Sequence, residues 1–204
     1  MSEFKSKIKT IEWVNNVSRM VDQTLIPYEY KMVDIKTANE MFDAIRTMIV
    51  RGAPAIGIAG AHGVALAAME IAAKTNDKEE FIEKLKQYAE YLKRSRPTAV
   101  NLMWAVDQQF ELAKNSEKTV DETVKMLIEN GIRLENEDIE INKKIGDNGA
   151  KLVKKGATIL THCNAGALAT VGYGTALGVV RSAFAKDNTI QVFADETRPR
   201  QQGA

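Results

Sequence analysis

The order of secondary structure predicted after Gly156 constrains the fold more than any other feature of this sequence. Residues 157–162 and 189–194 are short apolar runs of β-type, and residues 176–185 between them have the pattern of a helix. A strand, a helix and a second strand in this order form a βαβ unit, whose strands run parallel. Parallel sheets are buried on both faces and need several strands with covering helices. We therefore expect residues 155–204 to be the first βαβ unit of an incomplete, truncated Rossmann-like domain.

The preceding part of the chain predicts a small β-meander followed by helices. Residues 8–35 alternate apolar and polar side chains, and Asn15 with Asn16 is a typical turn. Helical segments follow up to residue 154. The sequence thus predicts an α/β protein with two domains. A β-meander and helical domain spans residues 1–154, and the parallel-sheet domain spans residues 155–204.

Two details of the helical region are specific predictions. Pro97 follows Arg96 at a break in the pattern, and we expect the next helix to start at this proline. Residues 119–154 have a helical pattern that is interrupted by glycines. The expected interruptions are near Gly131, Gly146 and Gly149.

An Ala- and Gly-rich stretch, residues 55–73, follows Pro54, which suits the first turn of a helix. Its glycines recur at every third position: Gly57, Gly60 and Gly63. Each glycine disfavours a helix by about 1 kcal/mol relative to alanine, so we expect a neighbouring element to approach closely there. The stretch also contains His62 and Glu70, and its Ala and Gly residues gain little free energy on transfer from water into a membrane. It therefore indicates a packed core helix rather than a membrane span.

The composition excludes several classes of partner. The 204 residues carry a net charge of +1 and are 45% hydrophobic, which suits a globular core. No excess of Lys or Arg exists to neutralise nucleic acid or a membrane surface, although a small anion needs only one or two cations. One cysteine permits no internal disulfide, and this favours the cytoplasm. Two histidines and one cysteine, widely spread, have no metal-ligand spacing.

The segment 161–166 carries the candidate nucleophile, Cys163, where a strand gives way to a loop. Ligands of open α/β sheets bind outside the carboxyl ends of the strands, and backbone N–H groups of residues 164–166 would favour a thiolate or an anion. The alternative is a buried structural cysteine, the commoner fate of a lone Cys. His162 points to the opposite face of the strand, so we expect it to be buried and hydrogen-bonded. We expect a structural role for His62 too.

Two arginines precede predicted helix starts, which is a favourable place for phosphate or carboxylate. Arg51 precedes Pro54 and Arg96 precedes Pro97. Each alone is more simply a surface arginine in a turn, but together they favour a phosphorylated ligand. Residues 195–199 mix acidic and basic side chains, for which an internal ion-pair network is the more frequent outcome. Residues 172–174 lack the G-x-G-x-x-G spacing of a dinucleotide site.

Four segments together resemble the methylthioribose-1-phosphate isomerase family. They are RGAPAIGIA from Arg51, RPTAVNL from Arg96, LTHCNAGALATVGYGTAL from Leu160 and ADETRPRQQGA from Ala194. The resemblance runs along essentially the whole chain. The same family includes ribose-1,5-bisphosphate isomerases and the regulatory alpha, beta and delta subunits of a eukaryotic translation-initiation exchange factor.

The resemblance implies roles for particular residues. Cys163 matches the catalytic cysteine of the family, and the catalytic aspartate and an Asn-Lys substrate contact lie beyond the end of this sequence. Asp195 does not replace that aspartate. Arg200 and Gln201 differ from the aromatic or aliphatic pair of many relatives, which bears on the local fit of substrate. The implied substrate contacts are Arg51, Gly52, Ala53, Arg96 and Gln202.

The implied activity is isomerisation of 5-methylthioribose 1-phosphate to 5-methylthioribulose 1-phosphate, a step of methionine salvage, by a cytoplasmic homodimer without metal or cofactor. Two alternatives stay open. A sister isomerase would act on 5-deoxyribose 1-phosphate or ribose 1,5-bisphosphate. A non-catalytic regulatory subunit would only sense a sugar phosphate. Retention of Cys163 within its full motif favours an enzyme.

Overall fold

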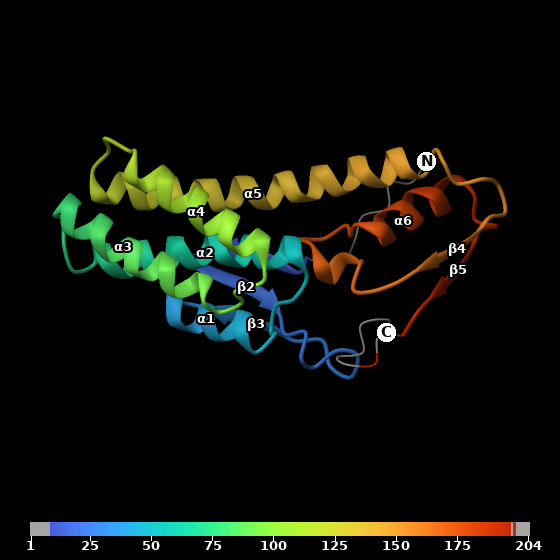
Figure 1. Ribbon diagram of the computed structural model, residues 1–204, viewed down its shortest axis with the longest axis horizontal. Coiled ribbons are helices and arrows are strands. Elements are labelled where there is room, and N and C mark those ends of the chain that lie inside the picture. Colours follow the sequence, from blue (N-terminus) through green and yellow to red (C-terminus); the bar gives the residue numbers. More distant parts are fainter. Residues whose placement is uncertain (1–8, 197, 199–204) are drawn as a thin grey trace.

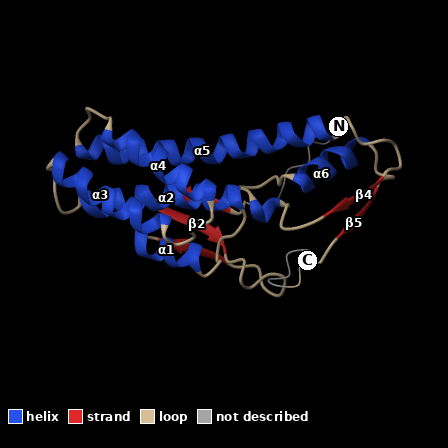
Figure 2. Ribbon diagram, in the orientation of Figure 1, coloured by secondary structure: helices blue, strands red, loops and turns tan. Residues whose placement is uncertain are grey.

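The computed structural model describes residues 9–196 and residue 198, and it has the mixed α/β architecture that the sequence predicts (Figures 1 and 2). An antiparallel sheet and a helical bundle occupy one end, and a parallel strand pair lies at the other. In chain order the elements are β1 (Ile11–Val14), β2 (Val17–Val21), β3 (Met32–Ile35), α1 (Ala38–Arg46), α2 (Ala53–Ala72), α3 (Lys78–Lys93), α4 (Val100–Lys114), α5 (Val120–Gly149), β4 (Thr158–Thr161), the 3₁₀ turn η1 (Ala167–Ala169), α6 (Ala176–Lys186) and β5 (Gln191–Ala194).

The predicted meander is confirmed. Strands β1, β2 and β3 form an antiparallel sheet in that order, with Val14 opposite Val17 across the first turn. Asn15 and Asn16 have φ values of 50° and 61°. Positive φ at both central residues is what a two-residue turn between right-twisted strands requires, and Asn tolerates it better than most residues.

Helix α2 forms the centre of the bundle. It packs against α1, α3, α4, α5 and β1 (Figure 1). It is long and apolar enough to span a membrane by length and composition, but 83% of that window is buried within the protein. A helix that is apolar on all sides is typical of such a buried position.

The predicted close approach at the glycines of α2 is confirmed. An added Cβ at Gly57 would lie 3.3 Å from the Asn101 carbonyl oxygen, and one at Gly60 would lie 2.7 Å from Leu102 Cδ1. The missing side chains therefore let the first turns of α2 and α4 lie against each other.

The structure corrects the predicted start of α4. The helix begins at Val100 with Ala99 as its N-cap, three residues after Pro97. Residues 96–99 instead close a turn in which the Ala99 N–H donates to the Arg96 carbonyl at 3.0 Å. Proline fits the second position of such a turn because its ring fixes φ at about −65°, the value that this position requires.

The structure also corrects the interruptions predicted within residues 119–154, because α5 ends at Gly149 and has no break. It runs without interruption over 30 residues, along one side of the whole molecule (Figure 1). Its glycines are contact points rather than breaks. A Cβ at Gly146 would lie 2.7 Å from Ser182 Oγ, and one at Gly149 would lie 2.6 Å from Val179, both on α6. Packing against α6 thus outweighs the low helix propensity of glycine.

The predicted βαβ unit is confirmed at the other end of the molecule. Strands β4 and β5 pair in parallel, with Thr161 beside Ala194 in register, and α6 connects them. A small cluster of Ala150, Ala183 and Ile190 fills the space between the strands, α6 and the end of α5. Leu160 and Phe193 are 68% and 63% exposed, so this strand pair leaves apolar surface uncovered.

Candidate active site

Cys163 lies two residues beyond the end of β4 and is exposed to solvent. It therefore occupies the carboxyl end of a parallel strand, where ligands of α/β sheets bind. Its φ of 72° is positive, an uncommon backbone conformation for a residue with a side chain and one that occurs often at functional sites. The structure rules out the alternative of a buried structural cysteine.

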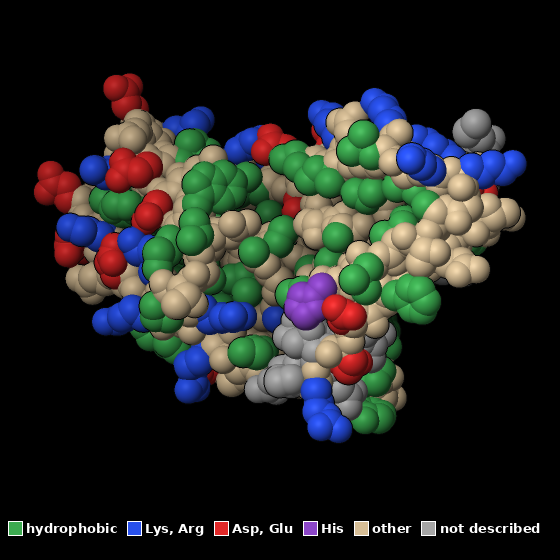
Figure 3. All heavy atoms as spheres, turned by 45° about the vertical axis from the view of Figure 1, so that its right-hand side comes forward, with side chains coloured by type: hydrophobic (Ala, Val, Ile, Leu, Met, Phe, Trp, Pro, Cys, Tyr) green, Lys and Arg blue, Asp and Glu red, His purple; other side chains and the backbone are tan. Residues whose placement is uncertain are grey.

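His162 is not buried as predicted. Its side chain is 68% exposed, and its Nδ1 lies 3.4 Å from Asp195 Oδ2. Pairing of β4 with β5 explains this position, because the residues that follow Thr161 and Ala194 emerge side by side from the strand ends. Figure 3 shows an exposed histidine beside acidic side chains on this surface. This contact pairs Asp195 with a histidine outside residues 195–199, so the predicted ion-pair network within that segment stays a prediction. Thr197 and Pro199 lie outside the described residues.

The Cys163 loop, residues 162–175, is folded tightly onto itself. The Ala165 carbonyl accepts hydrogen bonds from the backbone N–H groups of Thr175 at 3.0 Å and Leu177 at 3.2 Å. The Gly174 N–H donates to Thr170 Oγ1 at 3.0 Å. Gly174, at a φ of 92°, packs on Gly166. The loop thus has a defined conformation, which a reactive side chain needs for a fixed direction.

The Arg51 turn, residues 51–54, leads into α2. Arg51 is 7% exposed and donates through Nε to Gln23 Oε1 at 3.3 Å. Gly52, the N-cap of α2, has a φ of 101°, and Pro54 lies in the first turn of the helix, as predicted. A guanidinium at the amino end of a helix favours an anionic ligand, because both carry positive potential.

The structure brings the Arg51 turn and the Cys163 loop into contact. A Cβ at Gly52 would lie 2.3 Å from the Ala169 Cα. Gln23 Nε2 donates to the Leu168 carbonyl at 2.8 Å. Thr10, just before β1, also holds the Cys163 loop, because its N–H donates to the Val171 carbonyl and its Oγ1 donates to the Ala167 carbonyl, each at 2.7 Å. Two segments more than 100 residues apart therefore form one surface.

The remaining predicted site residues are placed less fully. Ala53 is the exposed first residue of α2, next to Gly52. Arg96 is half-buried in the turn before α4, and α4 lies beside the first turns of α2. Gln202 lies outside the described residues.

Sequence reasoning missed the polar residues that hold this surface together, namely Thr10, Gln23 and Asp138. Asp138 on α5 accepts the Val171 N–H through Oδ2 at 2.8 Å. Burial raises the pKa of the Asp138 carboxyl above its usual value, and the hydrogen bonds from Val171 and Asn142 partly oppose that effect. Thr10 and Gln23 are buried and Asp138 is half-buried. A single sequence does not distinguish such polar residues from those that face solvent.

His62 has the structural role that the sequence predicts. It is fully buried, with Nδ1 2.9 Å from Ser18 Oγ and Nε2 3.0 Å from Glu135 Oε1. It thereby ties α2 to β2 and α5. Within the described residues, no group of three or more His, Cys, Asp or Glu side chains is arranged to hold a metal ion.

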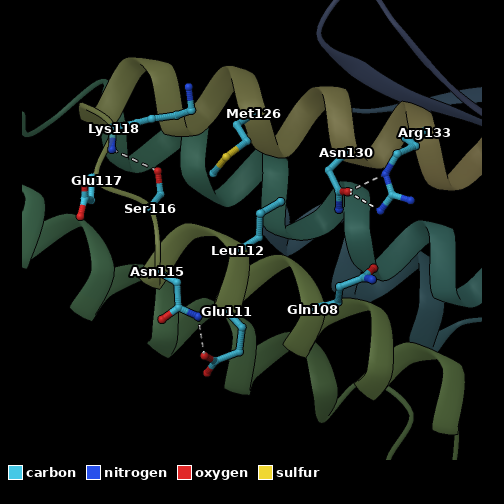
Figure 4. A pocket seen from close by; sticks show the side chains of 10 residues that line it. All are labelled: Gln108, Glu111, Leu112, Asn115, Ser116, Glu117, Lys118, Met126, Asn130 and Arg133. Carbon is cyan, nitrogen blue, oxygen red and sulfur yellow. Dashed lines mark hydrogen bonds between the residues drawn. The ribbon is translucent and has the colours of Figure 1, made fainter.

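A hollow of about 670 Å³ lies elsewhere, between the end of α4 and the start of α5 (Figure 4). Its polar side chains largely pair with one another. Asn115 bonds to Glu111, and Arg133 bonds to Asn130, as the close view shows. None of the predicted site residues lines it, so we place the candidate site at Cys163 and the Arg51 turn.

The fold and the site define a class of protein: an α/β protein with an exposed cysteine at a strand end, on a loop that contacts an arginine-bearing turn at a helix start. Residues 49–204 match the model of the initiation factor 2 subunit family. The chain belongs to that family.

Similar proteins agree with this assignment. The chain is 52% identical over 198 residues to a methylthioribose-1-phosphate isomerase of Acetivibrio thermocellus, covering 97% of this chain and 57% of the relative. It is 48% identical to one of Trichormus variabilis, with the same coverage. The chain thus spans a little over half the length of the curated relatives it matches.

Two solved structures have the same fold. The 5-methylthioribose 1-phosphate isomerase of Pyrococcus horikoshii OT3 superposes with a TM-score of 0.87 at 40% identity, covering 97% of this chain and 55% of that one. The translation initiation factor eIF-2B subunit delta of A. fulgidus superposes with a TM-score of 0.84 at 42% identity, covering 97% and 57%.

Proposed function

We propose that this chain carries the cysteine-bearing part of an aldose–ketose isomerase that converts 5-methylthioribose 1-phosphate to 5-methylthioribulose 1-phosphate in methionine salvage. The observation that supports it most is the exposed Cys163 at the end of β4, in contact through its loop with the Arg51 turn. Curated relatives near 50% identity have this activity in their names. We place the enzyme in the cytoplasm and expect a homodimer.

The proposed reaction moves a hydrogen between adjacent carbons of the sugar. An acid protonates the ring oxygen as its bond to C1 breaks, and the sugar opens. The Cys163 thiolate then removes the proton from C2, and the electron pair forms a C1–C2 double bond. Return of the proton to C1 and loss of the C2 hydroxyl proton yield the ketose. The family resemblance implies that this acid is an aspartate beyond residue 204. Hydride transfer from C2 to C1 is the competing pathway.

Phosphate binding falls to the two arginines in this proposal. Arg51 and the N–H groups at the start of α2 would hold the phosphate, with Arg96 beside them. Gly52 and Ala53 bring the backbone close to it. The phosphate ester at C1 prevents the sugar from opening as ordinary aldoses do, which is why an acid must assist. Binding of the phosphate at C1 would also orient the neighbouring C2 towards the thiolate.

Substitution of the single thiol tests the proposal. In the protein expressed from its complete gene, Cys163→Ser should lower kcat by at least about 10³-fold, because a hydroxyl is a far weaker base than a thiolate at neutral pH. Its Kd for the sugar phosphate should stay within about threefold of wild type, since the phosphate contacts remain. Full activity of the Cys163→Ser variant would contradict the assigned role.

A second candidate function is a sugar-phosphate-sensing regulatory subunit, which the similarity to an eIF-2B delta subunit favours. A sister isomerase is the alternative within the enzyme class. Turnover of three sugars, namely 5-methylthioribose 1-phosphate, 5-deoxyribose 1-phosphate and ribose 1,5-bisphosphate, separates these cases. Binding without turnover of any of them would support the regulatory subunit.

A further inference from the structure

Gln23 occupies a buried position between the two halves of the candidate site. It lies two residues after β2 and is 2% exposed. Its backbone N–H donates to the Ile49 carbonyl at 2.9 Å, which fixes the main chain just before the Arg51 turn. The main chain that carries the Gln23 side chain is therefore held in place.

The amide of Gln23 contacts both segments at once. Nε2 donates to the Leu168 carbonyl of the Cys163 loop at 2.8 Å and to the Arg51 carbonyl at 3.4 Å. Oε1 accepts from Arg51 Nε at 3.3 Å. Donor and acceptor are both engaged, so one side chain bonds the guanidinium of Arg51 and the main chain of both segments.

Gln23 is uncharged, and this matters for a phosphate site. A carboxylate here could also accept from Arg51 Nε, but it would neutralise the cation and compete with an anionic ligand. It could not donate to the Leu168 carbonyl. An amide accepts the same hydrogen bond from Arg51 without neutralising the guanidinium.

We propose that Gln23 is a positioning residue that joins the Arg51 turn to the Cys163 loop, so that the phosphate and the reacting carbon of one sugar are held in a single arrangement. This inference rests on the proposed function and adds a residue to its site. A long arginine side chain loses much rotamer freedom when it binds, and fixing it beforehand raises affinity.

Gln109 provides a matched control. It is also a fully buried glutamine whose Nε2 bonds two backbone carbonyls, those of Ala61 at 3.2 Å and Leu127 at 3.0 Å, and whose Oε1 accepts from Asn130. It joins α2, α4 and α5 within the bundle and has no part in the candidate site. Methionine has nearly the same volume as glutamine and lacks its hydrogen bonds.

The experiment compares Gln23→Met, Gln23→Glu and Gln109→Met in the protein expressed from its complete gene. It measures Tm, KM and kcat for 5-methylthioribose 1-phosphate, and the Kd of inorganic phosphate by calorimetry. Gln23→Met and Gln109→Met should lower Tm by similar amounts relative to wild type. Only Gln23→Met should raise KM and the phosphate Kd, by at least about tenfold, with the smaller change in kcat. Gln23→Glu should raise both constants further, because of its negative charge.

Each result decides between the alternatives. If KM and the phosphate Kd of Gln23→Met match those of Gln109→Met, Gln23 is only a structural residue and the inference is overturned. If wild type isomerises none of the three sugars, but binds phosphate in a manner that Gln23→Met weakens, the proposed function fails and the positioning role stands. If wild type neither isomerises nor binds phosphate, both fail.

Discussion

At the scale of single residues, the candidate site depends on backbone conformations with positive φ. Gly52 at 101° and Cys163 at 72° lie on the two segments that meet there. Only glycine adopts the first of these easily, and only glycine leaves room for Ala169. Cys163 is held by its surroundings in a conformation that a residue with a Cβ would otherwise avoid, as is common for reactive groups.

Gly52→Ala should therefore be strongly destabilising. The unfavourable backbone conformation adds about 1–3 kcal/mol, and the contact of the new Cβ with Ala169 adds about 1–3 kcal/mol more. Gly156→Ala is the control: its φ of 67° is also positive, but the nearest atom to a Cβ there is 3.8 Å away. Urea unfolding measures both. Equal losses in the two variants would show that the Ala169 contact contributes nothing.

At the scale of elements, α5 shows how packing overrides local propensity. A 30-residue helix with glycines at 131, 146 and 149 contradicts the breaks that those glycines predict. Each one faces another part of the protein at short range, His62 in the first case and α6 in the others. The helix persists because the close contacts with α2 and α6 stabilise it more than the glycines weaken it.

Gly146→Ala should destabilise the protein in spite of better helix propensity. Alanine contributes about 1 kcal/mol in a helix interior, but its Cβ would lie 2.7 Å from Ser182 Oγ and 2.8 Å from the Gly178 carbonyl. Overpacking of this kind costs about 1–3 kcal/mol, so we expect a net loss in urea unfolding. The exposed Asn136→Ala on the same helix should instead gain stability. A gain in Gly146→Ala would show that α5 and α6 separate readily.

At the scale of the whole molecule, α5 links the helical bundle to the Cys163 loop. It contacts α2, α4 and β1 in the bundle and packs against α6 at the other end. Asp138, near its middle, accepts the Val171 N–H of the loop. The boundary between residues 154 and 155 stays a prediction, and it falls just after this helix.

The raised pKa of Asp138 makes this link pH-dependent. Burial raises the pKa, so the folded state binds the proton more tightly than the unfolded state does. The free energy of unfolding should then fall as pH rises from about 4, the unfolded value, through the raised folded value. Asp138→Asn keeps an oxygen acceptor for Val171 and removes the titration. Urea unfolding from pH 4 to 8 should show wild type losing stability relative to the variant; a constant difference would contradict the assignment.

Much of the fold and the outline of the site were predictable from the sequence. The paired asparagines predict a hairpin, the spaced glycines predict close contact in α2, and the βαβ pattern places Cys163 at a strand end. These features are local, because they depend on residues within one or two turns or strands. The exposure of His162 was not predictable, since it depends on β4 lying beside β5 with little cover on that face.

The sequence by itself determined the type and order of the elements, the parallel pairing of β4 and β5 and the placement of a thiol at the end of β4, because periodicity and turn residues act over short distances. Only the tertiary structure decided that the Arg51 turn meets the Cys163 loop, that Gln23 joins the two segments, and that α5 runs unbroken past its glycines. Those outcomes depend on burial and on contacts between residues far apart in the chain, which no local pattern encodes.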